Sequence, residues 1–312
     1  MRAERDIVGV GALNLDHLAA GTAVGERIAR VMPTLEWGTE HSVDESTFRA
    51  AADASGTLTT TLGGSAFNTV ETVARTRPGL RLGYVGITGR VPPGAPSVLG
   101  RFDDLGIDRR FVFTDERHLS GVCLSYTERG DRTLLTHAGA NRHLAEHLDR
   151  QGAEVSDYLA RSRLVHVTSF LDPDSPGRLL TVLAEAKSLN PDLRISVDPG
   201  HVWASHPTSE IEGILAHADY LLVNEREFRD LGARAGVVVV KRPDGVRVHR
   251  GVGVTMTTHV PLADDEIGDA TGAGDAFAAG LLIGLVDSEF TGEPDVDLGL
   301  RLARDRLRRT RT

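Results

Sequence analysis

The chain contains little cysteine, few aromatic residues and no excess of positive charge. Its 312 residues include one cysteine, so no internal disulfide can form. Cys123 lies inside a short apolar run, and we interpret it as a small buried side chain rather than a nucleophile. The formal net charge of -9 argues against nucleic acid as a partner, because binding to a phosphate backbone needs a basic face.

Long hydrophobic runs and targeting signals are also lacking. No apolar stretch is long enough to cross a bilayer, and the first residues do not form a signal peptide, so we expect a cytoplasmic protein without a membrane partner. The twelve histidines show no zinc-binding spacing. Near the C-terminus an arginine cluster interrupts the acidic character, and we interpret it as a solvated helix end that complements the helix dipole. The cluster comprises Arg301, Arg304, Arg306, Arg308, Arg309 and Arg311.

Short apolar and β-branched runs alternate with segments of helical period. Apolar residues recur at helical spacing between residues 66 and 74 and between residues 179 and 189. Strands that are apolar nearly throughout suit a parallel sheet covered on both faces. The pattern predicts the α/β class, with a doubly wound, mostly parallel sheet flanked by helices. The expected strands are residues 7–12, 82–88, 164–168, 195–198, 220–224 and 237–241.

Two stretches break this alternation. Residues 122–127 and 133–137 flank a turn at 128–131, which predicts an antiparallel hairpin. Residues 16–63 are rich in Thr, Ser and Glu and give only weak strand signals. We expect a small β lid, formed from about residues 14–62 and 108–138, on a single domain that spans residues 1–312.

The most informative stretch is the run of small residues from 268 to 280, which reads GDATGAGDAFAAG. It stands where a loop becomes a helix, and the free amides and dipole of a helix start favour an anion. Gly272 and Gly274 would let the anion approach the backbone. Asp275 would repel that anion unless it works beside it, as a base that takes the proton of a hydroxyl attacking phosphorus. An ordinary helix N-cap would also account for this segment, since Asp is favoured at that position.

Polar residues also follow the expected strands, where open α/β sheets bind ligands. Asp16 comes just past the first strand, and Asn68 lies in the first turns of a helix that Gly63 and Gly64 open. Together Asp16 and Asn68 would offer an acceptor and a donor to neighbouring hydroxyls of a polyol. Each of them alone is explained equally well as a turn or cap residue.

A second polar pair, Asn224 and Glu227, follows the strand at 220–224. Their spacing places an amide oxygen and a carboxylate on one face of a helix. Such a pair can order the water shell of Mg²⁺. A helix start with an Asn cap and a following acid accounts for the same residues.

Taken in order, these motifs resemble the ribokinase-like, or PfkB, family of carbohydrate kinases. The resemblance runs from residue 7 to about residue 284, and its most specific part is DATGAGD at 269–275, the second signature of that family. It implies an ATP-dependent kinase that phosphorylates a hydroxyl of a sugar or nucleoside. The other matching segments are GALNLD at 11–16, the pair at 63–64 with Asn68, GV at 121–122, AGAN at 138–141 and NERE at 224–227.

The resemblance implies a role for each matching residue. Asp275 would be the catalytic base, and the amides of Gly272, Ala273 and Gly274 would form the anion hole. Asp269 would lie beside a monovalent cation site, which suggests K⁺. The lid would close over the acceptor and mediate a homodimer. The residues that would hold the acceptor are Asp16, Gly63, Gly64, Asn68 and Asn141. The residues that would hold ATP and Mg²⁺ are Asn224, Glu227, Lys241 and Gly245, with Glu227 acting on Mg²⁺ through water.

Several residues depart from the family pattern. Ala270 replaces the usual Thr, Arg90 stands where an acid is common, and the nucleotide loop at 240–245 keeps only its second glycine. The chain stops soon after the arginine-rich helix, so we expect a curtailed pocket for the nucleotide base. These departures leave a second function open, in which the protein binds a sugar or nucleotide as a sensor or scaffold without turnover.

The acceptor is not identified by the sequence. A nucleoside would need an aromatic platform for its base, and the candidates are Trp37, Phe67 and Phe170. A sugar phosphate would need a cationic clamp, and the candidates are Arg90, Arg27 and Arg30.

Overall fold

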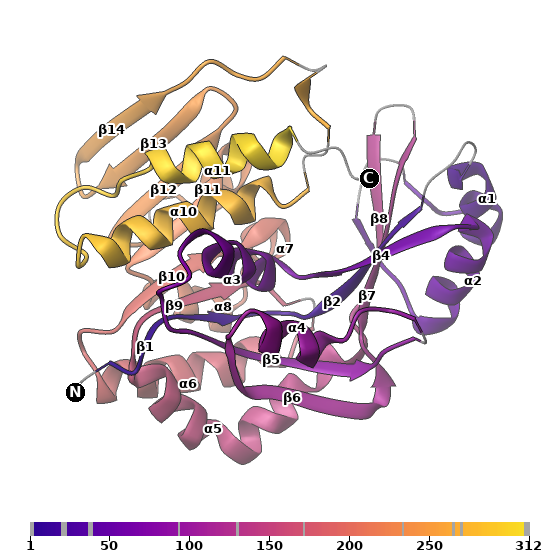
Figure 1. Cartoon of the computed structure of the whole chain (residues 1–312), viewed down its shortest axis with the longest axis horizontal. Coiled ribbons are helices and arrows are strands. Elements are labelled where there is room, and N and C mark those ends of the chain that lie inside the picture. The colour runs from indigo at the N-terminus through magenta and orange to yellow at the C-terminus, as the bar shows by residue number, and fades with distance from the viewer. Residues whose placement is uncertain are drawn as a thin grey trace.

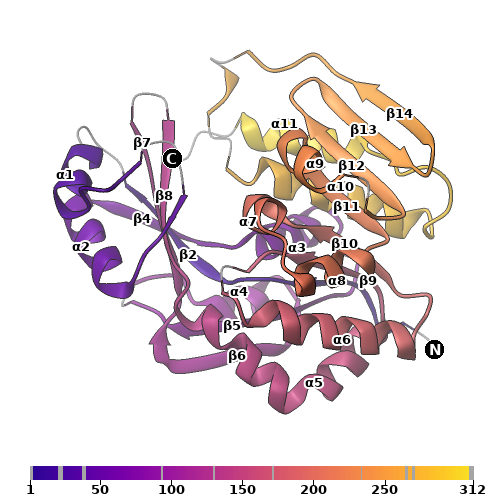
Figure 2. The ribbon, with the colours of Figure 1, turned by 180° about the vertical axis from the view of Figure 1, so that it is seen from behind.

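A nine-stranded sheet forms the body of the molecule in a computed structural model (Figures 1 and 2). The structure describes residues 3–19, 24–36, 40–92, 94–128, 131–170, 172–232, 234–263, 266–268 and 271–308. The strand order is β14-β13-β12-β11-β10-β9-β1-β5-β6, parallel from β12 to β6 and antiparallel at β13 and β14. The strands are β1 (Arg5–Val10), β5 (Leu82–Arg90), β6 (Asp108–Leu119), β9 (Ser162–Thr168), β10 (Arg194–Asp198), β11 (Tyr220–Asn224), β12 (Val237–Arg242), β13 (Gly245–Arg250) and β14 (Gly253–Thr258).

Helices cover both faces of this sheet because successive side chains of a strand point to opposite sides. In β1, Ile7 joins one buried cluster, while Val8 and Val10 join the other. The Ile7 side is covered by α3 (Ser65–Thr76), α4 (Val98–Asp104), α10 (Ala273–Asp287) and α11 (Asp297–Leu307). The Val8 side is covered by α5 (Leu144–Ala160), α6 (Ser175–Leu189), α7 (Gly200–Ser205), α8 (Ser209–Ala216) and α9 (Glu225–Leu231). None of the described helices is both long enough and apolar enough to span a membrane.

A five-stranded sheet stands beside the body, with the order β3-β8-β7-β2-β4 (Figure 1). Its outer face carries a third apolar cluster under two helices, in which Leu15 and Val122 from the strands meet Ile28 and Phe48. The opposite face is turned toward the large sheet. The elements are β2 (Asn14–Ala19), β3 (Glu40–Ser42), β4 (Leu58–Gly63), β7 (Gly121–Glu128) and β8 (Asp131–His137), with α1 (Val24–Val31) and α2 (Glu45–Ser55); a short 3-10 helix, Gly139–His143, follows β8.

The predicted α/β architecture and its six strands are confirmed, with strand ends that differ by at most two residues. The predicted hairpin is confirmed as well, since β7 and β8 pair antiparallel with Val122 opposite His137. Residues 129–130 of its expected turn lie outside the described residues.

Other predictions about the small sheet need correction. Asp16 does not follow the first strand, because β1 ends at Val10 and a new strand begins at Asn14. Residues 108–119 form β6 of the large sheet, so the second part of the small sheet starts at Gly121 and not at 108. The segment 16–63 also contains α1 and α2, which were not predicted and which are short, at 8 and 11 residues.

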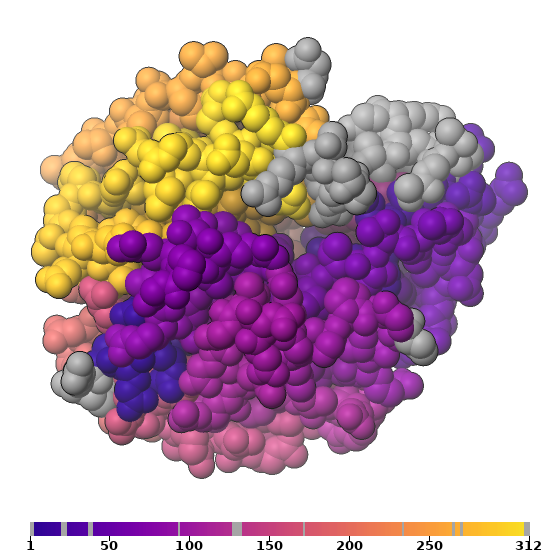
Figure 3. All heavy atoms as spheres, in the orientation of Figure 1, coloured from indigo at the N-terminus to yellow at the C-terminus, as the bar shows by residue number. Residues whose placement is uncertain are grey.

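The helix α10 is packed on all sides, and glycine makes this close packing fit. Its residues from Ala276 to Val286 are buried, apart from Gly284, between the sheet, α3 and α11. At the crossing with α11, a Cβ built on Gly280 would lie 2.4 Å from the backbone nitrogen of Gly299. The two helices therefore cross in direct backbone contact. Figure 3 shows these C-terminal helices, in yellow, against the purple N-terminal third.

Replacing Gly280 with Ala should separate α10 from α11. We expect the free energy of unfolding to fall by about 1–3 kcal/mol, because the added methyl group overpacks a contact between two backbones. Chemical denaturation measures this change. Gly177→Ala in α6 is the matched control, since its Cβ would lie 3.5 Å from the nearest atom, the Cγ of Glu210. Equal stability of the two variants would contradict the tight packing.

Candidate active site

Asp275 lies in the first turn of α10, at the point where the two sheets meet. The preceding Gly272 caps the helix in a left-handed conformation, with φ of 74°. The Nδ2 of Asn68 donates a hydrogen bond of 2.9 Å to Oδ2 of Asp275, and Thr69 Oγ1 donates to its backbone carbonyl at 3.3 Å. Burial raises the pKa of Asp275 to about 6, although the bond from Asn68 acts against this shift. The carboxylate is therefore a base that titrates near neutral pH.

A cavity of about 330 Å³ opens in front of Asp275, between the small sheet and the carboxyl ends of β1 and β9. Asp16 from β2, Asn68 from α3 and Asp275 from α10 all line it, so the structure brings these three predicted residues together. Further lining residues are Asn14, Glu40, Gly64, Cys123, Thr136, Asn141, Thr168, His201, Gly272 and Gly274.

Gly63 and Gly64 are required because neighbouring atoms leave no room for a side chain, and not because of a polar contact. A Cβ built on Gly63 would lie 2.2 Å from Oδ2 of Asp16, so a side chain there would displace that carboxylate. Gly64 has a φ of 106°, and its Cβ would lie 2.1 Å from the carbonyl oxygen of Ala12. Both glycines therefore set the position of Asp16 and of the start of α3.

Asn141 lies on the cavity wall, but its amide is already bonded to the chain. It accepts from the backbone nitrogen of Leu13 at 3.1 Å and donates to the carbonyl of Leu13 and to Oδ1 of Asn14, at 3.2 and 3.0 Å. Asn141 therefore orients Asn14, whose side chain also lines the cavity. Asn14 was not among the predicted residues, although it belongs to the same GALNLD segment as Asp16.

Asn224 and Glu227 form a capping box at the start of α9. Asn224 Oδ1 accepts from the backbone nitrogen of Glu227 at 2.9 Å, and Glu227 Oε2 accepts from that of Asn224 at 2.8 Å. The structural explanation of this pair is thus correct, and it does not exclude a second role. Glu227 is buried, which raises the pKa of its carboxyl, and Asp198 raises it further.

Lys241 lies near the acidic residues Asp198 and Glu227 and also near the start of α10. Its Nζ lies 2.6 Å from Oδ2 of Asp198, and a Cβ built on Gly274 would lie 3.6 Å from the same nitrogen. Burial works against the charged ammonium, yet Asp198 and Glu227 raise the pKa of Lys241. Lys241 therefore carries a positive charge at the N-terminus of α10.

Asp198 was not among the predicted residues, although it ends a predicted strand. The strand end was the available signal, because ligands bind outside the carboxyl ends of parallel strands. The charge of Asp198 raises the pKa values of Asp275, Glu227 and Lys241. When ionised, these three carboxylates and the one ammonium together carry a net negative charge. Carboxylate oxygens are also the ligands that Mg²⁺ prefers. The residues present therefore fit a hydrated Mg²⁺ ion. Asp269, the residue predicted beside a monovalent cation, lies outside the described residues.

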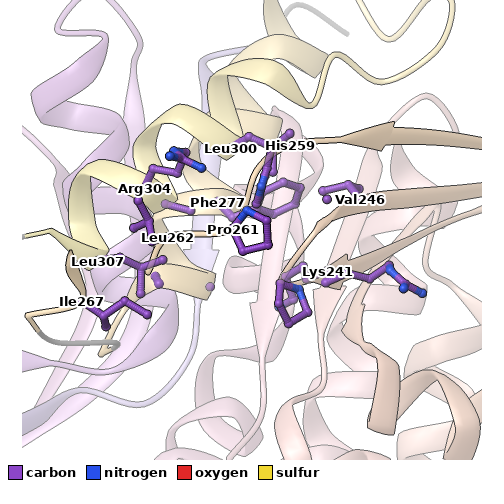
Figure 4. Close-up of a pocket in the computed structure, with 16 residues that line it drawn as sticks. Lys241, Val246, His259, Pro261, Leu262, Ile267, Phe277, Leu300, Arg304 and Leu307 are labelled. Carbon is purple, nitrogen blue, oxygen red and sulfur yellow. The ribbon is translucent and has the colours of Figure 1, made fainter. Parts of the chain in front are cut away.

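A second cavity, of about 270 Å³, lies on the other side of the α10 start (Figure 4). Leu300, Arg304 and Leu307 of α11 face Val246, His259 and Pro261 across it. The lining is mostly apolar, and it includes the predicted residues Lys241, Gly245, Ala273 and Gly274.

The C-terminal helix α11 supplies one wall of this cavity. In the altered loop, Pro243 and Asp244 form the tight turn between β12 and β13. Gly245 has a φ of 149°, and its Cβ would lie 2.1 Å from the carbonyl oxygen of Thr257. This glycine is needed for the close pairing of β13 with β14.

None of the aromatic and cationic candidates that the structure describes lines the first cavity. Phe67 and Phe170 are buried in the two cores of the large sheet, and Trp37 lies outside the described residues. Arg27 donates to the carbonyls of Ala54 and Ser55, which joins α1 to α2 on the outer face of the small sheet. Arg90 lines a separate cavity with Phe48. Arg30 is exposed on α1.

Asp275→Asn should change the pH dependence of stability. The pKa of Asp275 is raised from 3.8 to about 6 on folding, so its stabilising contribution is present below about pH 4 and lost as the pH rises through 6. We expect the Tm of the variant, relative to wild type, to be higher at pH 8 than at pH 4. Scanning calorimetry measures this difference, with the exposed Asp230→Asn as control. A difference that does not vary with pH would contradict the raised pKa.

The sequence is similar to those of known kinases. A model of the pfkB family of carbohydrate kinases matches residues 40–300. An uncharacterized sugar kinase of Archaeoglobus fulgidus is 27% identical, over 67% of this chain and 84% of that protein. An ATP-dependent ribose-1-phosphate kinase of Halopiger xanaduensis is 30% identical, over 70% of this chain and 72% of that protein.

Solved structures show the same fold. The adenosine kinase of Schistosoma mansoni in complex with 2-fluoroadenosine has a TM-score of 0.81 and 17% identity, covering 99% of this chain and 97% of that one. The adenosine kinase of Sinorhizobium meliloti has a TM-score of 0.76 and 19% identity, covering 97% and 92%. The family match extends over most of the chain and includes the helix start at Asp275, and the chain belongs to the pfkB family of carbohydrate kinases.

Proposed function

We propose that this protein is an ATP-dependent kinase that transfers the γ-phosphoryl group to a hydroxyl of a sugar or nucleoside. One observation carries the proposal. The N-terminus of α10 separates two cavities, and Gly274 lines both of them while Asp275 faces only the first. A nucleotide in the apolar cavity would place its phosphates at this helix start, and an acceptor in the other would place a hydroxyl at Asp275.

In the proposed reaction, Asp275 takes the proton of the acceptor hydroxyl as its oxygen bonds to the γ-phosphorus. The bond from phosphorus to the oxygen of the leaving ADP breaks at the same time. The amides of Gly272, Ala273 and Gly274 donate to the charge that develops on the phosphoryl oxygens. A base with a pKa of about 6 is ionised at neutral pH, so Asp275 is ready to accept a proton.

We assign the nucleotide phosphates and Mg²⁺ to the cluster of Asp198, Glu227 and Lys241 beside the start of α10. Lys241 at Gly274 would contact a phosphate oxygen, while Glu227 and Asp198 would order the waters of Mg²⁺. When bound, Mg²⁺ neutralises charge on the phosphate oxygens. The ion pair with Asp198 holds the ammonium of Lys241 at the helix start rather than in solvent.

The cavity in front of Asp275 favours an uncharged polyol. The ionisable groups among its described lining residues are the carboxyl groups of Asp16, Glu40 and Asp275, the imidazole of His201 and the thiol of Cys123, with no lysine or arginine. An acceptor phosphate would face these carboxylates, whereas hydroxyls can donate to them. The small sheet supplies Asp16 and Glu40, and we propose that it is the lid that covers the acceptor.

Asp275→Asn should reduce kcat by about 10²–10⁴-fold, because an amide cannot take the proton of the acceptor. Acceptor binding should change little, since Asn68 and Asp16 remain in place. Steady-state ADP release with Mg-ATP measures kcat, and calorimetry measures acceptor binding, over a panel of pentoses, hexoses, sugar phosphates and nucleosides. A variant that keeps wild-type kcat would rule out Asp275 as the base. Binding without turnover by the wild-type protein, on every compound, would instead support a sensor or scaffold.

Gly63→Ala should weaken acceptor binding selectively. The added methyl group would displace the carboxylate of Asp16, so we expect the KM for the acceptor to rise about tenfold or more, which corresponds to the loss of one charge-assisted hydrogen bond. The KM for ATP should stay unchanged. Gly79→Ala is the control, because a Cβ there meets nothing within 4 Å. Equal acceptor KM values in both variants would argue against Asp16 as an acceptor ligand.

A further inference from the structure

Arginines of helix α11 form hydrogen bonds with the segment that precedes the start of α10, while Arg301 and Arg308 remain exposed as the sequence predicts. Arg309 and Arg311 of the cluster lie outside the described residues. Arg304 donates through Nη1 to the carbonyl oxygen of Val260, and Arg308 donates to Glu266 at 3.0 Å. The carbonyl oxygen of Leu307 accepts from the backbone nitrogen of Gly268 at 2.9 Å. These bonds fix α11 against the segment that precedes the start of α10.

Arg306 extends from this fixed helix to the anion hole. A Cβ built on Gly272 would lie 3.4 Å from Nε of Arg306 and 3.7 Å from Oδ2 of Asp275. The guanidinium therefore lies at Gly272, the first residue of the proposed anion hole. Its side chain is half-buried rather than extended into solvent.

Two cations from different elements thus flank the same three backbone amides. Lys241 of β12 lies at Gly274, and Arg306 of α11 lies at Gly272. Three carboxylates act on the charge of Lys241, those of Asp198, Glu227 and Asp275. A guanidinium presents several N–H donors in one plane and can bind two phosphate oxygens at once, whereas an ammonium acts as a point charge.

We propose that Arg306 is a catalytic residue that binds the phosphoryl group during transfer. This inference rests on the proposed function and assigns a part of its site to α11. Arg306 would hold non-bridging oxygens of the γ-phosphoryl group as the bond to the acceptor forms and the bond to ADP breaks, and it takes no proton itself. It also offsets the repulsion between Asp275 and the phosphate, which share one helix start.

The same helix walls the nucleotide cavity through Leu300, Ala303 and Leu307. A nucleotide base in that cavity would pack against the element that carries the guanidinium. Base binding and phosphate alignment would therefore be coupled through α11. An isolated polyphosphate has no base to pack against α11 but would still contact Arg306. It therefore probes the contact with Arg306 alone.

The test compares Arg306→Ala and Arg306→Lys with Arg301→Ala, an exposed arginine of the same helix. We expect Arg306→Ala to lower kcat by about 10²–10³-fold, as the loss of a preorganised donor to the transition state does. Arg306→Lys should recover only part of the loss, because the bidentate contact is missing. Added guanidinium chloride at low concentration should raise kcat of Arg306→Ala and leave the other proteins unchanged.

A binding experiment separates this inference from the proposed function. Calorimetry with inorganic tripolyphosphate should show at least about tenfold weaker binding to Arg306→Ala than to Arg301→Ala, since one charge-assisted contact is lost. If the wild-type protein phosphorylates no acceptor, the proposed function fails and this binding result alone decides on Arg306. Tripolyphosphate affinity within twofold of Arg301→Ala would overturn the inference. Loss of kcat with a lowered Tm and without rescue by guanidinium would overturn it as well, by showing a structural role.

Discussion

A carboxylate held at the start of a helix is the constraint on which this structure depends. The start of α10 attracts anions, yet Asp275 puts a negative charge beside the place where a phosphate would bind. Burial raises the pKa of that carboxyl to about 6, and the bond from Asn68 keeps its ionised form accessible. Lys241 and Arg306 place positive charge beside the same helix start, and in the proposed site this charge would let an anion and a base share it.

The fold places this helix start between two different environments. On one side, β2 and α3 bring Asp16 and Asn68 to a polar cavity, and on the other, α11 and the β12–β13 hairpin form an apolar one. The close contact between Gly280 and Gly299 fixes the distance between α10 and α11. The packing of the C-terminal helices is thus linked to the geometry of the proposed phosphate site.

The sequence predicted those parts of the fold in which pattern and burial coincide. The buried parallel strands were identified because both of their faces are covered, whereas β14 was missed because it is exposed and rich in threonine. Asp16, Asn68 and Asp275 were found from short motifs. Asp198 and Arg306 were missed because their roles come from tertiary contacts: one faces a lysine 43 positions away, and the other reaches Gly272 from a separate helix.

The central claim is that Asp275 is the base that activates the acceptor, and the pH dependence of kcat for the wild-type enzyme tests it most directly. With a pKa of about 6, Asp275 is protonated and inactive at lower pH. The account predicts that kcat rises tenfold per pH unit below about pH 6 and becomes constant above about pH 7. A kcat that does not change between pH 5 and pH 8, with phosphoryl transfer as the rate-limiting step, would contradict it.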